Sequence, residues 1–76
     1  SGVDGVYSAD PNVDPSATRF DEITFKEVIE RDLRVMDMTA ITFCQDHALP
    51  ILVFDAVTSG NVHRALCGEP IGTLVR

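Results

Sequence analysis

The sequence predicts an α/β fold, and specifically the C-terminal part of a larger α/β domain with a mostly parallel sheet. The continuous apolar run from Ile51 to Phe54 is typical of a strand buried on both faces. Helix signals precede and follow this run, in the order expected of α/β proteins. The 76 residues also supply too few helices and strands to cover both faces of such a sheet.

The first 23 residues predict a short strand followed by a long loop. Residues 3–7 show strand-like alternation, and the stretch after them is rich in Asp and Pro. Loops of this length usually have a functional role or are disordered. Residues 10–14 resemble the opening of a calcium-binding loop, but Pro15 replaces the required Gly and Asp21 the usual Glu. We therefore interpret these Asp residues as turn formers.

Two helices are expected next. Thr24 and Glu27 have the spacing of a capping box, which predicts a helix from Phe25 to Asp32. Asp37 is suited to cap a second helix, which Pro50 would close. Apolar side chains recur at helical spacing in both.

The last third predicts the strand from Ile51 to Phe54, a third helix and a final strand. Residues 58–61 form a turn that can start a helix, and Gly68 would end it. The expected buried side of this helix is Val62, Ala65 and Leu66. Residues 72–75 suit a last short strand.

Composition and charge limit the classes of partner that this chain can bind. The chain is 45% hydrophobic, which indicates a folded protein, and its net charge is −6 with dispersed basic residues. Nucleic acid and anionic membrane surfaces are therefore poor partners. The longest apolar run, residues 48–54, is too short to cross a bilayer, and the first residues do not resemble a signal peptide. Two cysteines favour a reducing, cytoplasmic setting.

Few motifs carry chemistry by themselves. Cys44 with His47, and His63 with Cys67, could in principle form a tetrahedral zinc site, or the cysteines could simply be apolar helix-face residues. No nucleophile motif, carboxylate pair or lysine-containing phosphate loop stands out. We therefore expect no metal site in this chain.

Residues 3–11, Val-Asp-Gly-Val-Tyr-Ser-Ala-Asp-Pro, closely resemble a segment of the amino acid kinase superfamily. Residues 33–40, 49–54 and 60–75 resemble the bacterial uridylate kinase branch of this superfamily. Aspartokinases carry a different sequence at the start of the second helix, which corresponds to residues 33–40. The resemblance runs the whole length of the chain without gaps.

This resemblance implies a three-layer α/β/α sandwich, with residues 1–76 as the ATP-site-bearing C-terminal part of one domain. It implies transfer of the γ-phosphoryl group of ATP to UMP, with Mg²⁺, in pyrimidine nucleotide biosynthesis. Members are cytoplasmic hexamers, often regulated allosterically by GTP and UTP. By position, Ser1, Tyr7 and Asp10 would bind ATP, and Asp37 is a candidate for ordering lysines or magnesium near the phosphates.

The same resemblance places the glycine-rich phosphate loop, the catalytic lysine and the UMP pocket upstream of this chain. We therefore expect the 76 residues alone to be inactive as a kinase. The alternatives are a non-catalytic nucleotide-binding or assembly module, an aspartokinase-like member of the superfamily, and a zinc-stabilised mini-domain.

Overall fold

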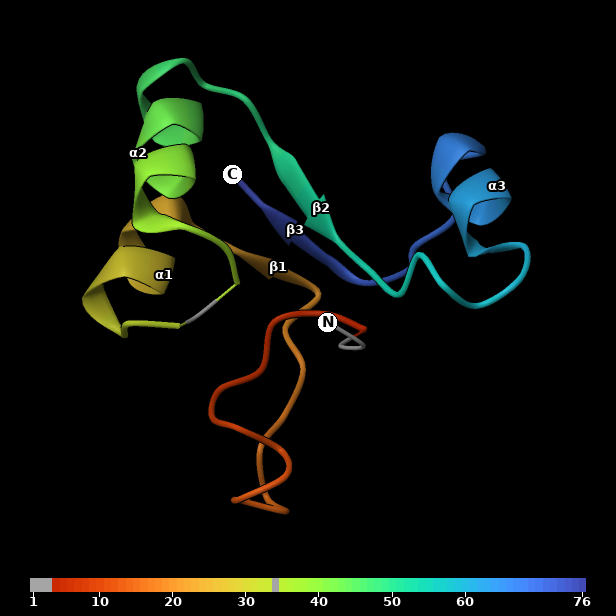
Figure 1. Ribbon diagram of the computed structural model, residues 1–76, viewed down its shortest axis with the longest axis horizontal. Coiled ribbons are helices and arrows are strands. Elements are labelled where there is room, and N and C mark those ends of the chain that lie inside the picture. Colours follow the sequence, from red (N-terminus) through yellow and green to blue (C-terminus); the bar gives the residue numbers. More distant parts are fainter. Residues whose placement is uncertain (1–3, 34) are drawn as a thin grey trace.

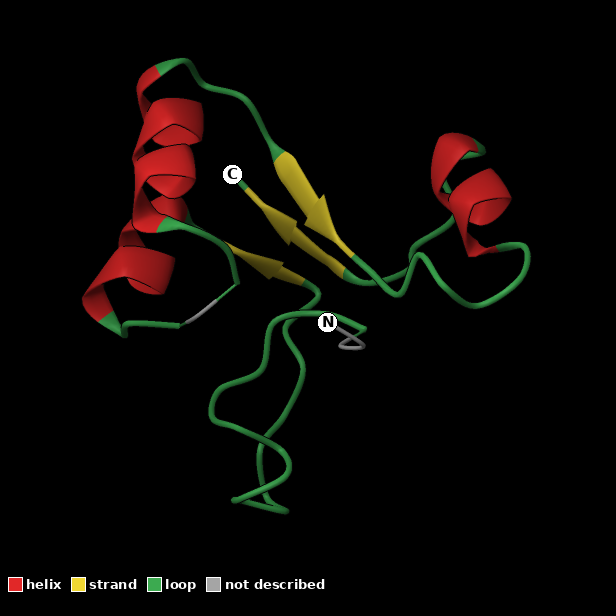
Figure 2. Cartoon of the chain, in the orientation of Figure 1, coloured by secondary structure: helices red, strands yellow, loops and turns green. Residues whose placement is uncertain are grey.

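The computed structural model describes residues 4–33 and 35–76. Its elements run β1 (Glu22–Ile23), α1 (Phe25–Glu30), α2 (Met38–Asp46), β2 (Ile51–Val53), α3 (Asn61–Leu66) and β3 (Thr73–Val75) (Figures 1 and 2). The order of helices and strands from α1 onward is the one that the sequence predicted.

The sheet has three strands in the order β1-β3-β2, so the last strand in sequence lies in the middle. β1 pairs with β3 in parallel, whereas β2 pairs with β3 antiparallel, in the register Leu52 opposite Leu74. The sheet is therefore mixed. The expectation that the Ile51–Phe54 run forms a parallel strand buried on both faces is wrong for the described residues, because β2 runs antiparallel and Leu52 is 37% exposed.

The core lies between this sheet and the helices α1 and α2. Six buried apolar side chains form it: Val6, Ile23, Phe25, Val28, Ile41 and Val75. The alternation of β3 explains the arrangement, because Val75 points into this core while Leu74, on the opposite face, is only half-buried. Within the described chain, only one face of the sheet has a helical layer.

The two helix starts follow their sequence signals. The Thr24 side chain accepts a hydrogen bond from the Glu27 N–H at 3.1 Å, and the Asp37 side chain accepts one from the Thr39 N–H at 2.8 Å. These bonds satisfy N–H groups that the first turn of a helix leaves unpaired. Both helices end earlier than expected, α1 at Glu30 and α2 at Asp46.

Three other expectations need correction. Among the described residues of the predicted strand at 3–7 there is no strand, only an isolated bridge between Tyr7 and Arg19, and residue 3 lies outside the described ranges. β1 falls in a stretch expected to be loop. α3 stands apart from the other helices (Figure 1), and its expected buried side is largely exposed, with Val62 at 50% and Leu66 at 83%.

Candidate nucleotide site

A pocket of about 590 Å³ lies between the first loop and the turn that follows α1. Residues 5–12 line one side of it, and residues 31–33 with Val35 line the other. Tyr7 and Asp10 are both lining residues, so the fold brings these two predicted site residues to the same pocket. The volume is within the range of pockets that hold small molecules and cofactors.

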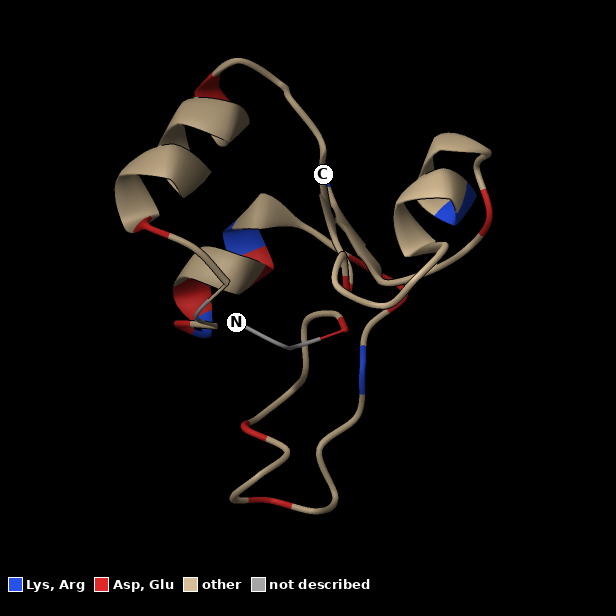
Figure 3. Cartoon of the chain, turned by 45° about the vertical axis from the view of Figure 1, so that its right-hand side comes forward, with Lys and Arg blue, Asp and Glu red and all other residues tan. Residues whose placement is uncertain are grey.

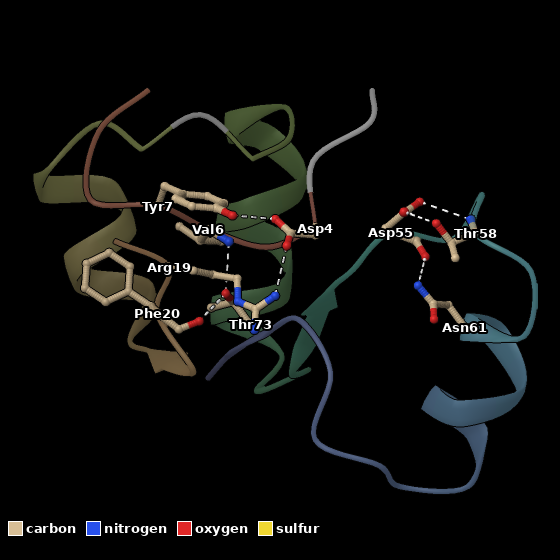
Figure 4. Close-up of polar contacts among 9 residues, drawn as sticks. All are labelled: Asp4, Val6, Tyr7, Arg19, Phe20, Asp55, Thr58, Asn61 and Thr73. Atoms are coloured by element: carbon tan, nitrogen blue, oxygen red, sulfur yellow. Dashed lines mark hydrogen bonds and ion pairs between the residues drawn. The ribbon is translucent and has the colours of Figure 1, made fainter. Parts of the chain in front are cut away.

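The Tyr7 ring is half-buried at this pocket, and its hydroxyl is anchored. The hydroxyl donates a hydrogen bond to Asp4 Oδ1 at 2.7 Å (Figure 4). This bond raises the pKa of the Tyr7 phenol above its usual value, and it lowers the pKa of the Asp4 carboxyl. The phenol therefore stays protonated, and its ring remains available to stack on a base.

Asp10 shapes the loop on which it lies. Its Oδ1 accepts a hydrogen bond from the Asn12 N–H at 2.9 Å, and its carbonyl accepts one from the Asp14 N–H at 2.8 Å. The sequence-based interpretation of Asp10 as a turn former is thus consistent with the geometry. A carboxylate has two oxygens, so this role leaves acceptor capacity for a ligand.

The loop is tied to the sheet by a buried threonine that the sequence reasoning missed. The Thr73 hydroxyl accepts a hydrogen bond from the Val6 N–H at 2.9 Å and donates one to the Phe20 carbonyl (Figure 4). The Phe20 N–H in turn donates to the Val6 carbonyl at 2.8 Å. Thr73 is fully buried in β3 and lies 67 positions from Val6, so no local sequence signal could have shown this contact.

The base of the loop is also closed by Asp4 and Arg19, whose side chains form an ion pair at 3.0 Å. Gly5 permits this approach, because a Cβ at that position would come within 2.7 Å of both Arg19 Cδ and Thr73 Oγ1. In the sequence, the one sign of this arrangement was that Asp4 and Tyr7 lie only three positions apart, close enough for their side chains to meet.

The other predicted site residues lie elsewhere. Ser1 is outside the described residues. Asp37 is exposed at the start of α2 and does not line the pocket. The structure brings Tyr7 and Asp10 together and leaves Asp37 as a helix cap.

The two Cys and His pairs do not converge. Cys44 and His47 belong to α2 and the segment after it, whereas His63 and Cys67 belong to α3 and its end, and these helices lie on opposite sides of the molecule (Figures 1 and 3). Across residues 4–33 and 35–76, no group of three His, Cys, Asp or Glu side chains could hold a metal ion. The zinc alternative therefore has no support in the geometry.

Figure 3 shows the Lys and Arg residues of the described chain dispersed over α1, α3 and other segments, with acidic residues spread along the loop between Tyr7 and Arg19. The described part of the chain contains no helix that is long and apolar enough to cross a membrane.

The amino acid kinase family matches residues 1–55, and the chain belongs to this family. The chain is 59% identical over 75 residues to a uridylate kinase of Streptomyces avermitilis, covering 99% of the chain and 30% of that relative. It is 56% identical over 73 residues to a uridylate kinase of Phocaeicola vulgatus, covering 96% of the chain and 31% of that relative.

Solved structures show the same relationship. A crystal structure of UMP kinase from Bacillus anthracis matches with a TM-score of 0.94 at 34% identity, over 100% of this chain and 31% of that one. The uridylate kinase of Archaeoglobus fulgidus matches with a TM-score of 0.77 at 32% identity, over 100% of this chain and 37% of that one. The chain thus spans about a third of the length of the relatives that it matches. The predicted α/β class and family are confirmed.

Proposed function

We propose that the chain is the ATP-site-bearing C-terminal part of an amino acid kinase domain that transfers the γ-phosphoryl group of ATP to UMP, giving UDP. The observation that carries this proposal is the pocket that Tyr7 and Asp10 share, in a chain closely similar to proteins named uridylate kinase. The aspartokinase-like alternative is not favoured, because the curated relatives at 55–59% identity are named uridylate kinases.

In this proposal the two residues have different tasks. The Tyr7 ring stacks on the adenine or packs on the ribose, because an aromatic face is a good platform for a base. Asp10 accepts hydrogen bonds from the nucleotide with the acceptor capacity that the Asn12 N–H leaves free. Ser1 at the start of the same segment is a third candidate contact, and Asp37 a candidate for ordering groups near the phosphates.

Magnesium would enter this reaction on the phosphates of ATP, where it offsets the negative charge of the transferring group. We assign no magnesium ligand within residues 4–33 and 35–76, because they hold no suitable group of three ligands. Phosphoryl transfer depends mainly on positioning and on cationic groups around the phosphates. Those groups and the UMP pocket would come from the rest of the domain.

Exposed apolar side chains favour such a larger domain. Leu52 is 37% exposed on the sheet face opposite the core, and Val62 and Leu66 of α3 are exposed as well. In the three-layer arrangement, the rest of the domain would cover these surfaces. The same proposal includes the quaternary structure and the regulation. The whole kinase assembles into a cytoplasmic hexamer, and GTP and UTP act as its effectors.

A chimeric kinase tests the proposal directly. In it, the matched 75 residues of the Streptomyces avermitilis uridylate kinase are replaced by the corresponding residues of this chain, and UDP formation from ATP and UMP is measured. We expect kcat within about tenfold of the parent, because the matched segments are 59% identical. A folded, hexameric chimera that makes no UDP would refute the proposed function, and the parent kinase is the matched control.

A further inference from the structure

The Asp4 carboxylate links Tyr7, which lines the nucleotide pocket, to Arg19 at the other end of the loop. Its Oδ1 accepts the hydrogen bond from the Tyr7 hydroxyl at 2.7 Å, and its Oδ2 faces Arg19 Nη1 at 3.0 Å. Figure 4 shows Asp4 between these two side chains, with the Tyr7 hydroxyl directed toward it. Asp4 itself is not a lining residue of the pocket, so it reaches the pocket only through Tyr7.

We propose that Asp4 is a positioning residue of the nucleotide site, which holds the Tyr7 ring in one orientation while Arg19 fixes the carboxylate. This inference rests on the proposed function, and it assigns a role to a residue outside the predicted site set of Ser1, Tyr7, Asp10 and Asp37.

Because the ion pair between Asp4 and Arg19 is exposed, its main effect is to orient the Asp4 carboxylate and not to stabilise the fold. The side chains of Arg19 and Asp4 are 38% and 49% exposed, and ion pairs this accessible to solvent add little to stability. The hydrogen bond to Tyr7 has a different effect, because it selects one orientation of a ring that is otherwise free to rotate about two side-chain torsions. Preorganising a binding group reduces the entropy that is lost when the ligand binds.

The anchor also restricts how Tyr7 can recognise a nucleotide. A phenol has a single O–H donor, and here Asp4 takes it. Tyr7 therefore offers a nucleotide its ring face and an acceptor oxygen, and no hydrogen-bond donor. The raised pKa of the phenol agrees with this assignment, since the proton is held between the two residues.

The backbone around the three residues is built for this arrangement. Tyr7 and Arg19 are paired through a β-bridge, which places both side chains at the base of the loop. Gly5 lies between Asp4 and Tyr7 in sequence and leaves the space that the Arg19 side chain crosses. Asp4, Arg19 and Tyr7 thus form one connected unit.

The test is a double-mutant cycle in the chimeric kinase, with Asp4→Ala, Tyr7→Phe and the double variant. We expect Asp4→Ala and Tyr7→Phe each to raise the KM for ATP about three- to fivefold, with kcat and the KM for UMP within about twofold of the unsubstituted chimera. Because Asp4 acts through the Tyr7 hydroxyl, the double variant should have the same KM for ATP as either single variant.

Asp14→Asn is the matched control, because Asp14 is a carboxylate of the same loop that bonds to Ser16 and does not line the pocket. Should Asp4→Ala fail to fold, Asp4→Leu in the same cycle keeps a side chain of similar size and still removes the acceptor of the Tyr7 hydroxyl. An unchanged KM for ATP in Tyr7→Phe, or effects that multiply in the double variant, would overturn the inference. An inactive unsubstituted chimera would instead refute the proposed function, so the two failures are distinguishable.

Discussion

Thr73 shows how one buried side chain fixes the candidate site. Its hydroxyl satisfies the Val6 N–H and the Phe20 carbonyl, which belong to the two ends of the loop that carries Tyr7 and Asp10. A buried backbone group without a partner costs about 1–3 kcal/mol, more than a typical hydrogen bond adds. The position therefore requires a hydroxyl more than it requires a particular apolar shape.

We expect Thr73→Val to lower the free energy of unfolding by about 2 kcal/mol, because valine keeps the shape and removes the hydroxyl. Thr73→Ser should recover most of the loss. The measurement is the thermal-unfolding midpoint of the chimeric kinase, with exposed Thr18→Val as the control. Equal midpoints for Thr73→Val and the unsubstituted chimera would show that the hydroxyl is not needed.

Asp55 organises the turn that leads into α3. Its carboxylate accepts hydrogen bonds from the Thr58 hydroxyl, from the Thr58 N–H at 3.2 Å and from the Val57 N–H at 3.0 Å. These bonds, the Thr58 hydroxyl first among them, lower the pKa of Asp55 below its ordinary value of 3.8. A lowered pKa in the folded state stabilises the fold above the unfolded-state pKa, and this contribution disappears as the pH falls through the folded-state pKa.

Asp55→Asn should therefore be less stable than the unsubstituted chimera at neutral pH, with the difference shrinking below about pH 4. Thermal midpoints of both proteins across the acid range check this expectation. A difference that stays constant, or grows, as the pH is lowered would contradict it. Asp46 is exposed, and Asp46→Asn serves as the control for replacing a carboxylate by an amide.

At the scale of elements, the pairing of β2 with β3 depends on the turn at Gly72. Gly72 has a φ of +72°, and a Cβ there would lie 2.1 Å from the Val53 carbonyl oxygen. Gly68 shares the positive φ, at +80°, but a Cβ there would meet nothing within 4 Å. The two glycines thus separate the cost of backbone conformation from the cost of a steric clash.

Gly68→Ala should cost about 1–2 kcal/mol, which is the penalty of a left-handed conformation for an L-residue. Gly72→Ala adds the clash with the carbonyl, and we expect at least twice that loss. Thermal or denaturant unfolding of the two chimeric variants makes the comparison. Similar losses at the two positions would mean that the strands adjust to the added methyl group at little cost.

At the scale of the whole molecule, the described chain buries one small core and leaves apolar side chains uncovered elsewhere. Among the described residues, α3 has no buried side chain, and Val57 beside it is 89% exposed. Apolar surface of this kind marks a contact with another part of a protein or with a partner. The chain spans about a third of its relatives, so a larger domain is the proposed source of that contact.

We expect the 76 residues in isolation to bind a hydrophobic dye more strongly than the chimera does, to associate in solution, and to form no UDP. Dye fluorescence, sedimentation and a coupled kinase assay measure these three properties. A monomeric, dye-negative chain would refute the assignment of its exposed apolar surfaces to domain contacts, and UDP formation would refute the assignment of essential groups to the rest of the domain.

The sequence by itself determined the three helices, the caps of α1 and α2 and the loop that carries Asp10, because capping residues, apolar periodicity and Asp-Pro turns act over a few neighbouring residues. Only the tertiary structure decided that β1 exists, that β2 is antiparallel, and that Thr73 and Arg19 hold the pocket in place. These features depend on pairing between residues up to 67 positions apart, for which local patterns carry no signal. The apolar side of α3 was visible in the sequence, but whether it is covered depends on groups beyond its own segment.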